Sequence, residues 1–112
     1  MLKLYQNRYR KIKIAIKNGG NPYYITSGEK IIFAIKKNTA IADTYVLSKV
    51  LTTTDRQDDY YILTLTSAET NISTGYYKFD IALRRTTGEL ETLVASDDCV
   101  IIESVTRSGT WT

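Results

Sequence analysis

The chain has 112 residues, of which 43% are hydrophobic and 11% aromatic, and its formal net charge is +3. This length suits one domain with a modest core. The sequence contains no histidine, which excludes Ser-His-Asp and Cys-His catalytic groups and histidine zinc sites. No apolar run approaches the roughly 20 residues of a membrane-spanning helix. We therefore expect a non-enzymatic protein with no metal, no cofactor and no membrane contact.

Basic residues dominate the first third of the chain: residues 1–37 hold nine Lys or Arg against one Glu. Over residues 11–17 they alternate with apolar residues, which predicts a strand with a basic, solvated face. On such a face basic side chains can meet acidic neighbours across the sheet, so nucleic acid is not the expected partner. The alternative is a nucleic-acid-binding module that uses the basic residues and tyrosines of this segment: Tyr5, Arg8, Tyr9, Arg10, Lys11, Lys13 and Lys17.

A period of two in the apolar residues predicts seven short strands. In four of them one row of side chains is expected to face the core: Ile12, Ile14 and Ile16, then Ile31, Phe33 and Ile35, then Tyr61, Leu63 and Leu65, and finally Tyr77, Phe79, Ile81 and Leu83. A connection at 38–43 leads to a third strand at 45–51. The last two strands are expected at 90–95 and 100–105, with a turn at Asp97 and Asp98 between them.

Thr66 and Glu69 have the spacing of a helix-capping box, which predicts one short helical turn near 67–71. The seven strands and their turns predict an all-β fold: an antiparallel immunoglobulin-like β-sandwich that forms a single domain over residues 1–112. Residues 1–9 are a candidate N-terminal arm, and residues 107–112 a C-terminal tail.

Two kinds of reactive side chain have an ordinary structural interpretation. Cys99, the only cysteine, lies in an apolar run and is expected to be a small buried hydrophobe in a protein of a reducing compartment. Five aspartates fall in two predicted loops, but they lack the ordered spacing of a calcium loop and are interpreted as solvated turn residues: Asp55, Asp58, Asp59, Asp97 and Asp98.

Six of the nine tyrosines form doublets, at residues 23–24, 60–61 and 76–77. Because adjacent strand residues point to opposite faces, each doublet should place one ring in the core and one outside. Exposed tyrosines are enriched at protein interfaces. The candidate partner-binding surface therefore consists of Tyr24, Tyr60, Tyr76 and Lys78.

Three segments resemble a known family when they are taken together: NPYYITSGEKIIFAIKK, YILTLTSAETNISTGYYKFDIALRRTTGELETLV and VIIESVT. Their pattern of strand ends and turns, with Gly-x-Tyr-x-aromatic-Asp-Ile-x-Leu at its centre, resembles the N-terminal domain of phage baseplate upper proteins and related structural proteins of phages and prophages of Gram-positive bacteria. The likeness covers about four-fifths of the chain. Gly75, Tyr77 and Asp80 match the motif, and the resemblance implies structural roles for them as turn, core ring and polar anchor beside Lys78 or Arg84.

The resemblance implies a virion structural protein, assembled in the bacterial cytoplasm, that contacts other tail or baseplate proteins and forms a homo-oligomer in a symmetric assembly. Family members that are longer carry onward modules toward a receptor-binding protein, whereas this sequence stops shortly after its last predicted strand. A bacterial surface adhesion domain or a carbohydrate-binding immunoglobulin-like domain is a further alternative, since exposed Tyr and Trp rings can stack on sugars.

Overall fold

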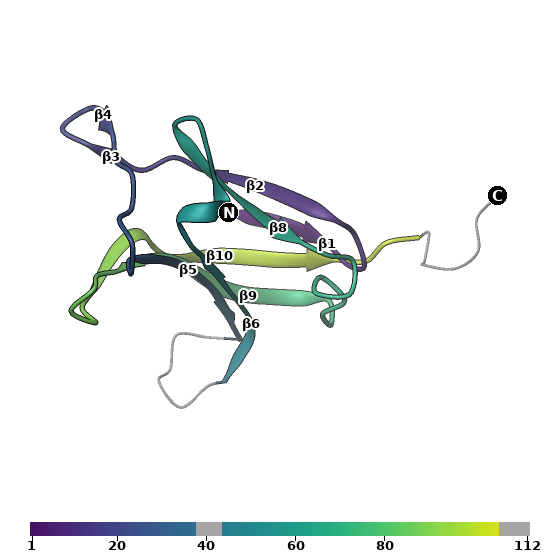
Figure 1. The fold of residues 1–112 in the computed structure, drawn as a ribbon. Helices are drawn as coiled ribbons and strands as arrows, with labels where there is room; N and C mark the ends of the chain where they lie inside the picture. The colour runs from purple at the N-terminus through teal and green to yellow at the C-terminus, as the bar shows by residue number, and fades with distance from the viewer. Residues whose placement is uncertain (38–43, 106–112) are drawn as a thin grey trace.

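The computed structural model describes residues 1–37 and 44–105, which form two larger β-sheets, a separate two-stranded hairpin and one short 3-10 helix (Figure 1). The larger sheet has five strands in the order β1-β10-β9-β5-β6. Their bounds are Leu2–Tyr5 for β1, Leu90–Ile102 for β10, Gly75–Arg84 for β9, Lys30–Lys36 for β5 and Tyr45–Leu51 for β6. Neighbouring strands in this sheet are antiparallel, except that β1 is parallel to β10.

The smaller sheet has three strands in the order β2-β8-β7, with bounds Arg10–Ile14, Tyr60–Leu65 and Arg56–Gln57. The 3-10 helix η1, Thr53–Asp55, leads from β6 into β7. A separate hairpin of β3, Lys17–Asn18, and β4, Asn21–Pro22, projects beyond the sheets. Gly19 and Gly20 form its turn, and both have the positive φ that only glycine adopts without strain.

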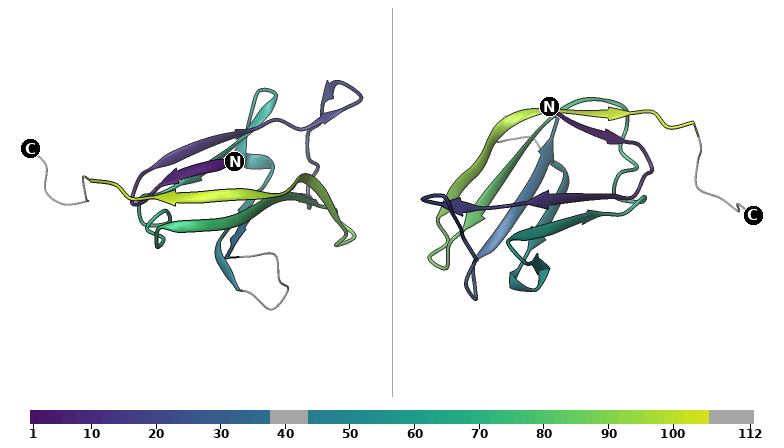
Figure 2. Two further views of the ribbon diagram at one scale, coloured as in Figure 1. Left: turned by 180° about the vertical axis from the view of Figure 1, so that it is seen from behind. Right: turned by 90° about the horizontal axis from the view of Figure 1, so that it is seen from above.

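The two sheets form two layers, seen in Figure 1 with β2 and β8 in one and β5, β9 and β10 in the other. Figure 2 shows the same layers from behind and from above. Their facing sides contribute to one core, which therefore lies between the sheets. The predicted inward rows of β5 and β8 are confirmed, because these six side chains are at most 1% exposed: Ile31, Phe33, Ile35, Tyr61, Leu63 and Leu65.

The inward row of β9 is also confirmed at Tyr77, Ile81 and Leu83, and Phe79 is half-buried against the same core. Ile14 and Ile16 are buried as predicted, while Ile12 is only partly buried. Cys99 is fully buried, and its burial raises the pKa of the thiol to about 11. This confirms its interpretation as a small buried hydrophobe.

The N-terminal segment differs from the prediction, because residues 2–5 form a strand and not an arm. β1 pairs in parallel with β10, with Leu2 beside Cys99 and Leu4 beside Ile101. Leu4 is 1% exposed. The physical reason is burial: the apolar alternation of this short segment fits the edge of a sheet whose neighbouring strand is far along the chain.

The predicted turn at Asp97 and Asp98 is wrong, because β10 runs through both residues from Leu90 to Ile102. The register with β9 shifts between Thr92 and Val94 and again between Val94 and Asp97. Such bulges bend a strand and turn side chains outward without ending it. Two acidic residues can therefore stay solvated inside one long strand.

The short helical turn expected near 67–71 is a hydrogen-bonded turn and not a helix. Its capping-box contacts are nevertheless present, since the Thr66 amide donates to Glu69 Oε1 at 2.9 Å and the Glu69 amide donates to Thr66 Oγ1 at 3.2 Å. The only helix in the described residues is η1, so no described helix is long and apolar enough to cross a membrane.

Two predictions fall on residues outside those described: the connection at 38–43 and the tail at 107–112. The described residues confirm a nearly all-β chain whose sheets are mixed and antiparallel.

Candidate interaction surfaces

The tyrosine doublets of β8 and β9 divide between the core and the outside, as the alternation predicts. Tyr77 is 6% exposed and its neighbour Tyr76 is 72% exposed. Tyr61 is buried, where its hydroxyl accepts a hydrogen bond from the Ile25 amide at 2.8 Å, while Tyr60 is half-buried on the other face. Since β8 and β9 belong to different sheets, the outer rings lie on opposite outer faces of the molecule.

Tyr24 and Tyr60 contribute to one surface, on the side of the three-stranded sheet. The Tyr24 hydroxyl donates to Asp59 Oδ1 at 2.6 Å, and the Arg56 guanidinium lies 4.3 Å from the centre of the Tyr24 ring. The hydrogen bond to Asp59 raises the pKa of Tyr24. Lys13 Nζ lies 4.0 Å from the centre of the Tyr60 ring. We call this the Tyr24–Tyr60 surface.

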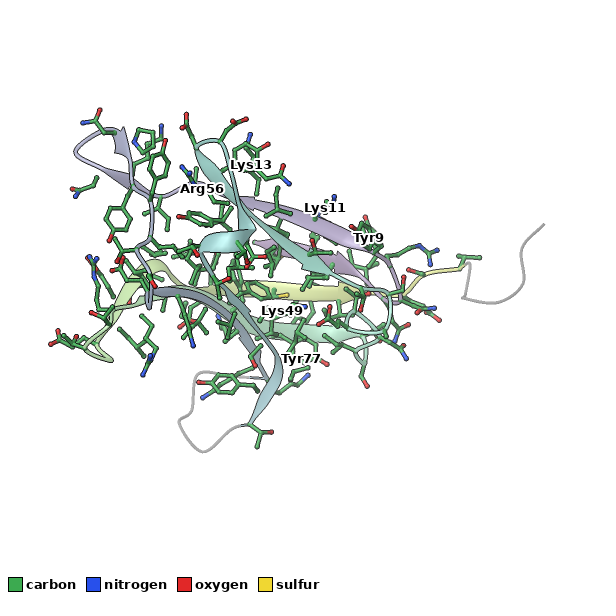
Figure 3. All side chains as sticks on the ribbon, viewed as in Figure 1. Tyr9, Lys11, Lys13, Lys49, Arg56 and Tyr77 are labelled. Atoms are coloured by element: carbon green, nitrogen blue, oxygen red, sulfur yellow. The ribbon has the colours of Figure 1, made fainter. Side chains whose placement is uncertain are left out.

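Basic residues of β2 extend the same side of the molecule, where Figure 3 shows Lys11 and Lys13 along the strand. Across the sheet, Lys11 is opposite Thr64 and Lys13 is opposite Ile62. The acidic cross-strand neighbours expected for this face are therefore not there, and both lysines are exposed. This part of the surface is basic.

Tyr76 and Lys78 form the second surface, on the outer face of the five-stranded sheet. Lys78 makes an ion pair with Asp98 on the adjacent strand β10. Tyr76 is opposite Val100, so its ring stands beside a partly buried aliphatic side chain. We call this the Tyr76–Lys78 surface. The four residues that were predicted to form one partner-binding surface therefore belong to two separate surfaces.

The residues of the family-like motif have distinct positions on β9. Gly75 begins the strand with a φ of +142°, which disfavours any other residue there. Tyr77 packs in the core and its hydroxyl donates to the Ser73 carbonyl at 2.6 Å. Asp80 is exposed, and no hydrogen bond or ion pair joins it to another described residue.

A shallow groove of about 210 Å³ lies on the outer face of the five-stranded sheet. Its polar lining comes from Lys36, Tyr45, Lys78 and Asp80. Lys36 Nζ lies 4.8 Å from the centre of the Tyr45 ring. Charges of both signs therefore surround an aromatic ring, next to the Tyr76–Lys78 surface.

The five loop aspartates do not converge. Asp55 belongs to η1, where its carboxylate accepts a hydrogen bond from the Thr52 amide at 2.8 Å, whereas Asp97 and Asp98 lie in β10. Over residues 1–37 and 44–105, no group of three or more His, Cys, Asp or Glu side chains could hold a metal ion.

Sequence reasoning missed a buried ionic network around Glu29, which we call the Glu29 corner. Glu29 is 6% exposed. Its Oε1 accepts hydrogen bonds from the Thr26 amide at 2.8 Å, the Thr26 hydroxyl at 2.9 Å and the Tyr23 hydroxyl at 2.8 Å. Its Oε2 accepts from Arg85 Nη1 at 2.8 Å. Arg85 in turn donates through Nε to Glu91 at 2.9 Å.

These donors, the Thr26 amide first, lower the pKa of Glu29 to about 2, although burial acts in the opposite direction. The hydrogen bond to Glu29 also raises the pKa of Tyr23. One signal for this site is visible in the sequence, since Thr26 and Glu29 have capping-box spacing. The contact of Arg85 with Glu29 could not be predicted from the sequence, because the two residues are far apart along the chain.

No family model matches the chain, and neither a curated protein nor a solved structure matches it.

Proposed function

We propose that this chain is a non-enzymatic structural protein of a phage or prophage virion, which acts through protein–protein contacts in a tail or baseplate assembly. The observation that carries the proposal is the placement of Tyr60 and Tyr76 on opposite outer faces of a two-layer body. A domain with contact surfaces on both faces can join two neighbours at once, which a repeated assembly requires.

The two surfaces have the chemistry of protein interfaces. Exposed tyrosines offer a large, stiff contact area, and a few aromatic or arginine side chains usually contribute most of an interface's binding energy. The Tyr24–Tyr60 surface adds Arg56, and the Tyr76–Lys78 surface adds a lysine whose ion pair with Asp98 is exposed. The immunoglobulin-like arrangement of the two sheets belongs to the same proposal and is supported by the resemblance in Gly75, Tyr77 and Asp80.

The test is capture of the tail and baseplate proteins encoded in the same genome, together with light scattering of the mixtures. We expect capture, and we expect Tyr76→Ser or Tyr60→Ser to weaken it about tenfold or more. Tyr9→Ser is the matched control, because Tyr9 is exposed but belongs to neither surface. A chain that captures none of these proteins would refute the proposal.

One observation favours a second candidate, a nucleic-acid-binding module. Lys11 and Lys13 are exposed on β2 without acidic neighbours across the sheet, and Lys13 lies over the Tyr60 ring. Lysines beside an aromatic ring can hold a single strand by phosphate contacts and stacking. This candidate predicts binding to a single-stranded oligonucleotide that weakens steeply with salt and is lost in Lys11→Glu/Lys13→Glu. Undetectable or salt-insensitive binding would remove it.

A further inference from the structure

The five-stranded and three-stranded sheets have four edge strands, and three of these carry features that hinder pairing with another chain. β7 has only two residues. β2 carries Arg10, Lys11 and Lys13, so two copies of it would repel each other. In β1 the Lys3 carbonyl already accepts a hydrogen bond from Arg10 Nη1 at 3.0 Å. Short strands, charged side chains and covered backbone groups are the usual protection of sheet edges.

β6 carries the fewest such features. It is seven residues long, contains no proline, and pairs on one side only, with β5, among the described strands. Its register with β5 shifts once near its start, between Ile35 and Lys36, so that Tyr45 and Val46 are both exposed. Its outward side chains are uncharged: Val46 is 39% exposed, Val50 is 51% exposed, and the small Ser48 lies between them. Such an edge is open to pairing with a further strand.

The one charge of β6 is turned away from this outer face. Lys49 is opposite Phe33 of β5, whose ring is buried in the core, so Lys49 points to the inner side of the sheet. There its Nζ donates to Glu69 Oε2 at 2.7 Å. An inward lysine often blocks edge pairing, but here the charge is neutralised within the same molecule.

We propose that β6 pairs antiparallel with β6 of a second copy, about a twofold axis at Ser48, so that two five-stranded sheets join into one. Directly opposed residues of an antiparallel pair point to the same face. In this register Val46 of each copy is opposite Val50 of the other, and Ser48 is opposite itself. The same strand thus serves as both partners, as a twofold interface requires.

The sequence of β6 selects this register over its neighbours. Centring the axis on Lys49 would place two like charges directly opposite each other, which destabilises a strand pair. Centring it on Leu47 would leave Val46 opposite Ser48 and Val50 opposite Thr44. Only the axis at Ser48 joins the two exposed valines and keeps the lysines from opposing each other.

The pairing specifies one contact of the proposed assembly, and it rests on that proposed function only in assuming that copies of the chain meet. Dimerisation is measured with the purified chain alone, whereas the virion proposal depends on capture of tail proteins. A dimer that captures no tail protein would therefore refute only the virion proposal, and a monomer that captures them would refute only the β6 pairing.

The experiment is sedimentation velocity over a dilution series of the full chain and two double variants. The wild type is expected to form a dimer. Val46→Lys/Val50→Lys places lysine opposite lysine twice, so dimerisation should weaken about tenfold or more. Val46→Lys/Val50→Glu loses the same two valines but places lysine opposite glutamate, so its dimer should stay within about threefold of the wild type.

Both variants change exposed positions, and circular dichroism with urea unfolding verifies that they fold. Tyr76→Ser, on the same sheet face but away from the edge, is the control and should dimerise like the wild type. Three results would overturn the proposal: a wild type that is monomeric at every concentration, a dimer that persists in Val46→Lys/Val50→Lys, or equal loss of the dimer in both double variants.

Discussion

Glu29 and Asp98 each hold a basic side chain, but their surroundings are opposite. Glu29 is 6% exposed and accepts four hydrogen bonds from three residues, whereas the Asp98 side chain is 52% exposed and holds Lys78 alone. A buried carboxylate depends on all its donors, while an exposed ion pair exchanges readily with water. The Glu29 corner therefore stabilises the fold, and the outer face leaves Lys78 available to a partner.

The largest effect is expected when the Glu29 corner loses its charge. Glu29→Gln keeps the size of the side chain but places an amide group among donors, so the free energy of unfolding should fall by about 2–3 kcal/mol. Urea unfolding measures it. The control is Glu91→Gln, which removes the exposed partner of Arg85 and should change stability by less than about 0.5 kcal/mol. Equal losses in the two variants would contradict the distinction drawn from burial.

The loss of stability in acid should distinguish the Glu29 corner from the outer face. Because the pKa of Glu29 in the folded chain is about 2, below its ordinary value of 4.5, its contribution is complete above about pH 4.5 and disappears as the pH falls toward 2. The linked free energy is about 3 kcal/mol. In unfolding curves across this window, Glu29→Gln should lose less stability than the wild type. The pKa of Glu69 is lowered too, so a smaller decline should remain. If the free energy of unfolding fell by the same amount with pH in Glu29→Gln and in the wild type, the result would contradict a low pKa for Glu29.

An intermediate effect is expected for Lys49 and Glu69, whose side chains are 29% and 27% exposed. Glu69→Ala removes the ion pair and the capping hydrogen bond to the Thr66 amide, which should cost about 1 kcal/mol. Lys49→Met removes only the ion pair and should cost less. Urea unfolding of both variants tests this order, and a larger loss in Lys49→Met would reverse it.

The smallest effect is expected on the outer face. Lys78→Ala removes an exposed ion pair and should change the free energy of unfolding by less than about 0.5 kcal/mol. The same variant should weaken capture of tail proteins if the Tyr76–Lys78 surface is used. A stability loss as large as that of Glu29→Gln would show that the outer face also holds the fold together.

Local alternation predicted the parts of the fold that depend on one strand at a time. The inward rows of β5, β8 and β9 follow from side chains that alternate with a period of two, and so does the division of Tyr76 from Tyr77. The seven-residue span of β6 was also predicted correctly.

Features that join distant segments could not be predicted in the same way. β1 finds its parallel neighbour β10 nearly a hundred residues further along the chain, and Arg85 reaches Glu29 across 56 residues. Asp97 and Asp98 indicate a turn by composition, and only the register shifts with β9 explain how a strand carries them. These contacts depend on pairing that no local pattern contains.

The parallel pairing of β1 with β10 has a consequence for folding kinetics. Leu2 lies beside Cys99, so this contact closes a loop that contains most of the chain. Closing a loop of that length has an entropic cost that must be met before the contact stabilises anything. During synthesis Leu4 has no strand to cover it until the residues near Ile101 are made. β1, which is made well before β10, is thus expected to be among the last strands to dock.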